Sequence, residues 1–272
     1  VGPGTDPWPP PPCRIGRPAS TVAWVTLSDY RTAVVTGASS GIGAATVEAL
    51  RGRGLEVYAV ARRADRLAAL AERTGCVARV LDVRDTDALT VMLGSLEADV
   101  LVNNAGLGRA ARTLADAATE DVDRILSTNV VAAVHAARAV LPGMMDRGRG
   151  HVVNVGSMAG LYPLASSVYG ASKGALHVLS MDLRLELAGT GVRITEICPG
   201  RVRTEFYDVA VDDPELRARL KESGVDEVTA GDVADAIVYA IDAPWRVNVN
   251  RIELQPTEQT YGGMQFTPRE ER

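Results

Sequence analysis

From Thr32 onward, short apolar runs alternate with longer segments in which apolar residues recur at helical spacing. Short runs rich in Val, Ile and Ala fit buried strands. Strands that alternate with helices of this length are typical of parallel βαβ units, with helices covering both faces of the sheet. The pattern predicts strands at residues 32–36, 56–61, 77–81, 99–103, 151–155, 193–198 and 251–254, and helices at 44–53, 65–73, 86–96, 127–147, 166–188 and 230–241.

No internal linker or block of charge interrupts this alternation, so we expect one α/β domain over residues 29–264. The N-terminal stretch differs from the rest, because residues 1–12 are rich in proline and exclude both a helix and an interior strand. We therefore expect residues 1–28 to be a flexible arm, or an upstream extension from a misassigned start codon. Residues 265–272 are expected to form a C-terminal tail.

Composition and charge narrow the classes of partner. The chain is 46% hydrophobic but only 4% aromatic, and its formal charge of −5 argues against nucleic acid as the main partner. No run approaches the roughly 20 apolar residues of a membrane span, so no membrane partner is expected. Cys13, Cys76 and Cys198 lack paired or metal-ligand spacing, and the three histidines are equally scattered. We expect a reduced, cytoplasmic compartment and no catalytic metal.

The first predicted strand leads into a glycine-rich turn and then a helix. Backbone without β-carbons can approach a pyrophosphate closely, and a helix N-terminus meets its negative charge. The spacing Gly37-x3-Gly41-x-Gly43 differs from Gly-x-Gly-x-x-Gly, so the interpretation depends on the strand before it and the helix after it. A glycine-rich turn without a ligand is the alternative. The expected cofactor contacts here are Gly37, Ser39, Ser40, Gly41, Ile42 and Gly43.

The second predicted strand ends in two arginines, Arg62 and Arg63, and no carboxylate follows before Asp65. In NAD sites an acidic side chain commonly binds the ribose 2′-hydroxyl at this place. Arginine can instead form charge-assisted hydrogen bonds to a 2′-phosphate. NADP is therefore favoured over NAD, and the alternative is that both arginines are solvated charges at the start of a helix.

Tyr169 and Lys173 lie four residues apart in a segment of helical pattern. At 3.6 residues per turn, both side chains share one face. An ammonium beside a phenol favours the phenolate, so we expect Lys173 to lower the pKa of Tyr169. A tyrosine with such a pKa can give or take a proton near neutral pH, as an alcohol-to-carbonyl interconversion requires.

The glycine loop, the Asn103-Asn-Ala-Gly106 segment, Ser157 and Tyr169-x3-Lys173 stand in one ordered chain. Together they resemble the short-chain dehydrogenase/reductase family over about residues 30–262. The resemblance implies a Rossmann-type, doubly wound, parallel seven-stranded sheet in a single domain. Tyr169 would be the general acid/base, and Lys173 would lower its pKa and hold the nicotinamide ribose. Ser157 would position the substrate oxygen, and Asn129 would support a proton-relay water near the lysine.

The same resemblance assigns further cofactor contacts. Asp82 and Val83 would contact adenine, and residues after the fourth strand would lie along the adenosine and ribose. The segment after the sixth strand would flank the nicotinamide, although a plain turn after a strand also explains its Pro-Gly pair. Ser157 precedes Tyr169 by 12 residues, one fewer than the common family spacing. Ser40 stands where some NADP-preferring members carry a basic residue. The residues concerned are Asn103, Ala105, Gly106, Pro199, Gly200, Val202 and Thr204.

These assignments imply reversible hydride transfer between NADP(H) and a secondary alcohol or its carbonyl compound. The run from Ala243 to Gly263, with Thr204-Glu-Phe206, is similar to NADP-dependent 3-hydroxy acid and serine dehydrogenases, and also to actinobacterial carbonyl reductases. A reductase of a bulkier ketone or a 3-ketoacyl thioester stays open, as does a non-catalytic NADP-binding protein.

Two further expectations concern the surroundings of the site. Residues 205–228 suit a mobile lid over the substrate. Arg201 or Arg203, just before this segment, is either a surface charge or a partner for a substrate carboxylate. Packing of the helices at 127–147 and 166–188 across subunits in relatives implies a homotetramer or homodimer.

Overall fold

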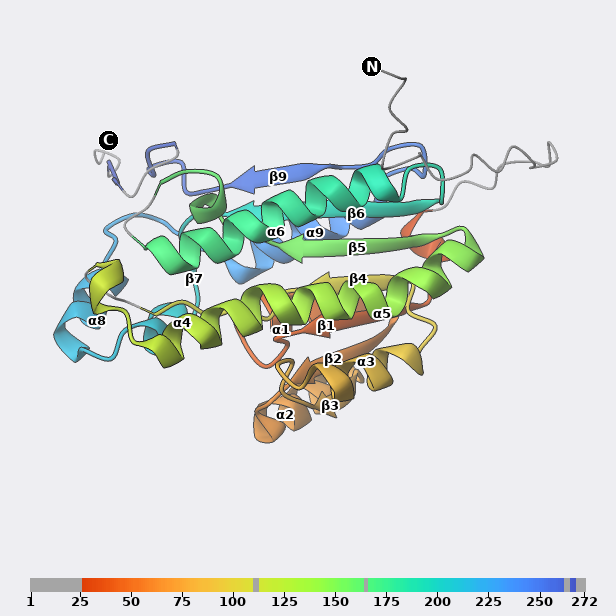
Figure 1. The fold of residues 1–272 in the computed structure, drawn as a ribbon, viewed down its shortest axis with the longest axis horizontal. Helices are drawn as coiled ribbons and strands as arrows, with labels where there is room; N and C mark the ends of the chain where they lie inside the picture. The colour runs from red at the N-terminus through yellow and green to blue at the C-terminus, as the bar shows by residue number, and fades with distance from the viewer. Residues whose placement is uncertain (1–25, 110–112, 164–165, 262–264, 268–272) are drawn as a thin grey trace, which may run out of the picture.

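The computed structural model describes residues 26–109, 113–163, 166–261 and 265–267. Its centre is a seven-stranded sheet in which every pairing is parallel, in the order β3-β2-β1-β4-β5-β6-β9 (Figure 1). The strands are β1 (Thr32–Thr36), β2 (Glu56–Ala61), β3 (Val77–Val80), β4 (Val100–Asn103), β5 (Gly150–Val155), β6 (Val192–Pro199) and β9 (Arg251–Leu254).

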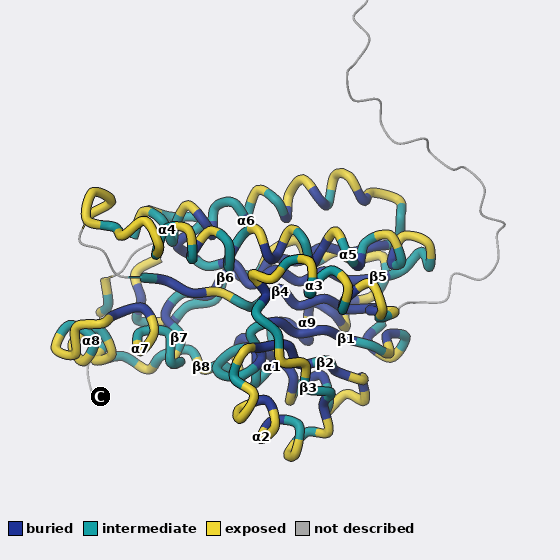
Figure 2. The backbone as a smooth tube through the Cα atoms, turned by 60° about the horizontal axis from the view of Figure 1, so that its bottom comes forward, coloured by how far each residue is buried: buried dark blue, intermediate teal, exposed yellow. Residues whose placement is uncertain are grey.

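Helices cover both faces of the sheet, because strand side chains alternate between the two. In β1, Ala33 and Val35 enter one apolar cluster, while Val34 enters the other. Figure 2 shows the buried strands lying between helices whose outer sides are exposed. The first cluster packs against α1 (Gly41–Gly52), α2 (Ala64–Thr74) and α9 (Ala230–Asp242), and the second against α3 (Thr86–Gly94), α5 (Ala132–Arg147) and α6 (Ser167–Glu186).

The strand order reverses between β1 and β4, as in a doubly wound sheet. In such sheets a crevice opens outside the carboxyl ends of the strands at the reversal point, and ligands bind there. The glycine-rich turn follows β1 directly, and the Asn-Asn-Ala-Gly segment follows β4. The predicted α/β architecture and its seven strands are therefore confirmed.

The helix predicted at residues 127–147 is longer in the structure. α4 (Thr119–Leu126) runs through a π-helical turn (Ser127–Val131) into α5, a continuous stretch of 29 residues that contains an apolar window with a mean hydropathy of 1.3. By length and composition this stretch matches a membrane span. Its apolar residues Ala132, Val140 and Met144 are instead buried against the sheet and α3, and this packing explains the composition.

The segment after β6, which was expected to form a mobile lid, contains short regular elements that the hydrophobic pattern did not predict. It contains β7 (Val202–Arg203), which pairs with β8 (Val228–Thr229) in a small parallel sheet, and between them α7 (Phe206–Ala210) and α8 (Pro214–Lys221). Asp213 caps α8 by accepting hydrogen bonds from two backbone amides. Elements this short depend on caps and tertiary contacts rather than on hydrophobic periodicity.

The predicted boundaries of the domain also need adjustment. Residues 26–28, grouped with the arm by composition, belong to an ordered turn in which Leu27 is buried and its amide donates to Asp242. Residues 265–267 fold back, since Gln259 and Phe266 form a β-bridge. Residues 1–25 and 268–272, the remainder of the predicted arm and tail, lie outside the described residues.

Candidate active site

The glycine-rich turn after β1 is built to let backbone approach backbone. Gly37 and Gly41 have φ angles of +67° and +52°, a region that favours glycine. A β-carbon on Gly43 would collide with the carbonyl oxygen of Gly37 and lie 2.6 Å from Asn104 Nδ2. Ser40, at the N-cap of α1, makes no side-chain capping hydrogen bond, so it leaves the amides of the first helical turn to another partner. The turn therefore fits a pyrophosphate at the N-terminus of α1.

The end of β4 holds this turn in place. Thr36 Oγ1 accepts hydrogen bonds from the backbone N–H groups of Asn104 (3.1 Å) and Ala105 (3.0 Å). The side-chain Nδ2 of Asn104 donates to the carbonyl oxygens of Thr36 (2.9 Å) and Gly37 (3.3 Å). Asn104 was not among the predicted site residues, although it belongs to the Asn-Asn-Ala-Gly segment. Its role is to fix the distance between the ends of two strands.

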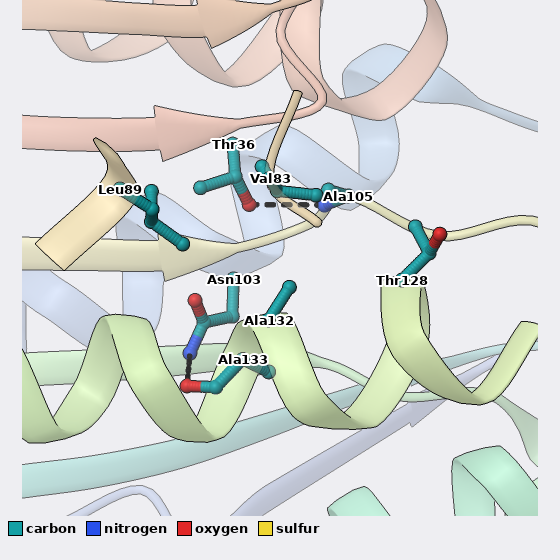
Figure 3. A pocket seen from close by; sticks show the side chains of 8 residues that line it. All are labelled: Thr36, Val83, Leu89, Asn103, Ala105, Thr128, Ala132 and Ala133. Carbon is teal, nitrogen blue, oxygen red and sulfur yellow. Dashed lines mark hydrogen bonds between the residues drawn. The ribbon is translucent and has the colours of Figure 1, made fainter. Parts of the chain in front are cut away.

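Asn103 has a structural role that the sequence did not indicate. Its side chain is buried and donates to Asn154 Oδ1 on the neighbouring strand (2.9 Å) and to the carbonyl oxygen of Ala133 (3.3 Å). Figure 3 shows it beneath a small pocket that Val83 and Ala105 also line. Because its Nδ2 group is already bonded inside the protein, Asn103 could contact an adenosine only through its side-chain oxygen or its backbone.

The two arginines at the end of β2 point in different directions. Arg63 donates to Ser39 Oγ (2.9 and 3.0 Å) and to Ser40 Oγ (2.6 Å), and so lies against the glycine-rich turn. Arg62 lies 3.6 Å from Asp82. The Arg84 guanidinium, 2.6 Å from Asp82, is the main cause that lowers the pKa of that carboxyl. Of the two predicted candidates, Arg63 is therefore placed at the phosphate loop and Arg62 at the edge of the crevice.

Two charged residues that the sequence did not single out as site residues join this cluster. Glu205 accepts hydrogen bonds from Arg66 (2.6 and 2.7 Å) and from Arg63 (3.2 Å). The same two guanidiniums, Arg66 first, lower the pKa of Glu205. Arg66 stands three residues after Arg63, one helical turn along α2, and that spacing is the signal that could have found it.

Ser157, Tyr169 and Lys173 meet at the carboxyl end of β5. Ser157 caps a short 3₁₀ turn by accepting a hydrogen bond from the Ala159 amide (3.1 Å), and its side chain acts on the pKa of Tyr169. Tyr169 and Lys173 share one face of α6, as the four-residue spacing predicts, with the lysine nitrogen 5.9 Å from the centre of the tyrosine ring. The ammonium donates to the carbonyl oxygen of Val155 at 2.7 Å.

The predicted lowering of the tyrosine pKa is wrong for this structure. Burial of the hydroxyl raises the pKa of Tyr169 to about 12, and the opposing effect of the Ser157 side chain is smaller. Burial also lowers the pKa of Lys173 to about 8. In both cases the loss of hydration of the charged form outweighs the nearby partners. At neutral pH the site therefore presents a protonated phenol.

Asn129 lies in the π-helical turn between α4 and α5 and is fully buried. Its amide exchanges two hydrogen bonds of 2.9 Å with the backbone of Leu107 and donates a third to Ser172 Oγ at 2.9 Å. A β-carbon on Gly106 would lie 3.4 Å from both Asn129 Oδ1 and Lys173 Nζ. The structure therefore brings the predicted asparagine and lysine together around Gly106, and π turns of this kind often occur at functional sites.

The segment after β6 closes the crevice from the other side. Gly200 donates its amide to Leu254, and Val202 belongs to β7. The methyl group of Thr204 lies 3.2 Å from where a β-carbon of Gly41 would be. The next aromatic residue, Phe206, lies 5.4 Å from the Tyr169 ring, centre to centre. The predicted nicotinamide flank thus reaches from the glycine-rich turn to the tyrosine.

The two arginines of this segment are both occupied. Arg201 is buried, pairs with Glu227 at 2.7 Å and stacks over the Tyr207 ring at 4.5 Å. Arg203 is largely exposed and pairs with Asp226 at 3.2 Å. The expectation of a surface charge fits Arg203 alone, and Arg201 has a structural role that leaves no free guanidinium for a substrate carboxylate. Among the described residues, no three His, Cys, Asp or Glu side chains gather as a metal-binding group.

Comparison with known proteins gives consistent relatives. A family model described as short chain dehydrogenase matches residues 31–215. The NADP-dependent 3-hydroxy acid dehydrogenase YdfG of Escherichia coli (strain K12) is 38% identical over 240 residues, which cover 85% of this chain and 97% of the relative.

Two solved structures agree with that relationship. The closed form of serine dehydrogenase complexed with NADP+ is 37% identical with a TM-score of 0.82, covering 88% of this chain and all of that one. A short-chain dehydrogenase from Sphingobium yanoikuyae in complex with NADPH is 31% identical with a TM-score of 0.71, covering 81% and 87% of the two chains.

Proposed function

The chain belongs to the short-chain dehydrogenase family, and on that basis we propose that it is an NADP(H)-dependent oxidoreductase. It interconverts a secondary alcohol, in the first place a 3-hydroxy acid, and the corresponding carbonyl compound. The observation that carries this proposal is the meeting of Ser157, Tyr169 and Lys173 at the carboxyl end of β5, beside the glycine-rich turn. The names of the relatives support both the cofactor and the substrate class.

The residues present fit the cofactor. Gly37, Gly41 and Gly43 leave room for a pyrophosphate at the N-terminus of α1, and Arg63 lies at the place where a 2′-phosphate would need a cation. Lys173 would hold the nicotinamide ribose. Asp82, Val83 and the backbone of residues 103–106 would lie along the adenosine, and Pro199, Val202 and Thr204 would flank the nicotinamide.

The protein's own groups handle the proton. Bound NADPH supplies the hydride, and in that direction Tyr169 donates its phenolic proton to the carbonyl oxygen of the substrate. The raised pKa of Tyr169 keeps this proton in place at neutral pH until an acceptor arrives. Ser157 orients the same oxygen by donating a hydrogen bond to it, and the Lys173 ammonium stabilises the phenolate that is left. Asn129, beside the lysine at Gly106, supports the return of a proton.

A substrate screen tests this function. We expect NADPH to be oxidised in the presence of 3-oxo acids, and NADP+ to be reduced with 3-hydroxy acids including serine, faster than with NADH or NAD+. A bulkier ketone or a 3-ketoacyl thioester as the best substrate would move the assignment to the second class of reductase. Binding of NADPH, followed by nicotinamide fluorescence, without turnover across the whole panel would point to a non-catalytic NADP-binding protein.

The protein is also proposed to be a homotetramer, or a homodimer, through the outer face of α5 and α6. A groove on this face is lined by apolar side chains that include Val134, Leu141, Met145 and Leu179, and α6 adds exposed Met181. An exposed apolar face on packed helices favours a second copy of the same surface. Sedimentation of the wild type should give a species of two or four chains, which Met145→Glu should dissociate.

The buried free thiols of Cys76 and Cys198 support a reducing, cytoplasmic location. Fractionation of the source cells should recover the protein with cytoplasmic markers. Recovery with an exported fraction would contradict this location.

A further inference from the structure

The acidic residue at the arginine cluster comes from a distant part of the chain. Glu205 precedes α7, while Arg63 and Arg66 lie at the start of α2, 142 and 139 positions away. Its carboxylate binds both guanidiniums, and Arg63 bonds at the same time to the hydroxyls of Ser39 and Ser40. Two guanidiniums bind one carboxylate, and two serine hydroxyls hold one of these guanidiniums, so the site suits an anion with several acceptor oxygens.

The neighbours of Glu205 in the chain touch the rest of the crevice. Thr204 contacts the glycine-rich turn at Gly41, and Phe206 packs on the Tyr169 ring at 5.4 Å. Three consecutive residues therefore reach the phosphate turn, the arginine cluster and the tyrosine. The ion pairs of Glu205 with Arg63 and Arg66 are among the contacts that hold the segment carrying Phe206, so displacement of the carboxylate removes a tether of that segment.

We propose that Glu205 occupies the 2′-phosphate subsite until the phosphate of NADP(H) displaces it, and that this exchange releases the segment that carries Phe206. The proposal rests on the proposed use of NADP(H). A ribose 2′-phosphate carries close to two negative charges at neutral pH and three acceptor oxygens, against one charge and two oxygens for the carboxylate. The phosphate therefore displaces the carboxylate from Arg63 and Arg66. NAD(H), with a 2′-hydroxyl in place of the phosphate, leaves Glu205 paired with both arginines.

Competition of this kind has a consequence for affinity. Glu205 reduces the fraction of molecules whose arginines are free, so it weakens the apparent binding of any ligand that carries the phosphate. Removing its charge should tighten that binding and leave ligands without the phosphate unaffected. The side chains are 40–45% exposed, so the effect is modest and is largest at low salt.

The experiment compares wild type with Glu205→Gln by titration calorimetry at about 50 mM salt, a low ionic strength at which exposed charges still interact. The ligands are NADP+, NAD+, 2′,5′-ADP and 5′-AMP. We expect the variant to bind NADP+ and 2′,5′-ADP about three- to tenfold more tightly, with less than about a twofold change for NAD+ and 5′-AMP. Glu48→Gln is the matched control, because Glu48 forms an equally short and exposed pair with Arg73 away from this site.

Hydrogen exchange provides a second readout that does not depend on turnover. In the wild type, 2′,5′-ADP should speed amide exchange in residues 204–210, and in Glu205→Gln that exchange should already be fast without ligand. If Glu205→Gln binds NADP+ no more tightly than the wild type, the displacement proposal is overturned. The proposed function is unaffected by that result as long as the wild type binds NADP+. Wild type that binds no NADP+ would overturn both.

Discussion

Lys173 Nζ donates a hydrogen bond to the carbonyl oxygen of Val155 at 2.7 Å. This bond crosses from α6 to the last residue of β5, two positions before Ser157, and fixes the lysine beneath the tyrosine ring. Because α6 presents Tyr169 one turn earlier on the same face, this contact ties the helix that carries Tyr169 to the strand end that leads to Ser157. The relationship explains how a short helix–strand junction can hold a proton donor, its charged neighbour and a hydroxyl together.

The buried lysine makes the stability of the cofactor-free protein depend on pH. Burial lowers its pKa to about 8 from an ordinary 10.5, so between these values the unfolded chain holds a proton that the folded chain has lost. Stability rises with pH wherever the unfolded state binds more protons, by up to about 1.4 kcal/mol per pH unit for one group.

Lys173→Met removes this effect. The free energy of unfolding of the wild type, minus that of the variant, should therefore rise by about 1–2 kcal/mol between pH 8 and pH 9.5. Urea denaturation at both pH values measures it, and other titrating groups cancel in the difference. A difference that stays constant with pH would mean that the lysine is not held in a dehydrated environment.

Gly43 tests the close packing of the glycine-rich turn. The methyl group in Gly43→Ala would meet the backbone of Gly37 and the side-chain amide of Asn104, which two hydrogen bonds hold in place. We expect a loss of about 1–3 kcal/mol in the free energy of unfolding and loss of nucleotide binding. Gly94→Ala is the control, because nothing lies within 4 Å of its added carbon, and it should keep both stability and binding. Equal behaviour of the two variants would contradict the packing argument.

Asn129 also contributes to the stability of the fold, and this contribution should be measurable without substrate. Asn129→Ala leaves the N–H and C=O of Leu107 without their partner in a buried place, which should cost about 2–4 kcal/mol of stability. Ser172→Ala removes only one of the three hydrogen bonds of Asn129 and should cost about 1 kcal/mol. Chemical denaturation of both variants checks the ranking, and an Asn129→Ala protein as stable as the wild type would show that the Leu107 bonds contribute little.

The sequence predicted the sheet well because each buried strand and each helix of this fold has its own local pattern of apolar residues. Alternating apolar runs locate all seven strands to within a residue or two, and turn glycines mark where the first helix follows. Even so, α1 begins at Gly41, three residues before the predicted start at Ala44. Glycine lowers helix propensity, so the pattern starts late where the site requires glycine in the first turn.

Contacts between distant residues were out of reach of the sequence. Nothing local to Glu205 indicates Arg66, 139 positions away, and nothing local to His177 indicates its 2.7 Å pair with the buried Glu196. The predicted direction of the shift in the pKa of Tyr169 was wrong for a related reason. Spacing along a helix revealed the lysine, but the degree of burial, which outweighs it, arises from the whole fold.

The central claim is that Tyr169 is the proton donor of an NADP(H)-linked reductase, and Tyr169→Phe with NADPH and the best carbonyl substrate tests it most directly. The change removes one oxygen and leaves the ring packing on Phe206 in place. We predict that turnover falls by about 10²-fold or more, while the Kd for NADPH, measured by nicotinamide fluorescence, is largely unchanged. Turnover at the wild-type rate in Tyr169→Phe would contradict the account.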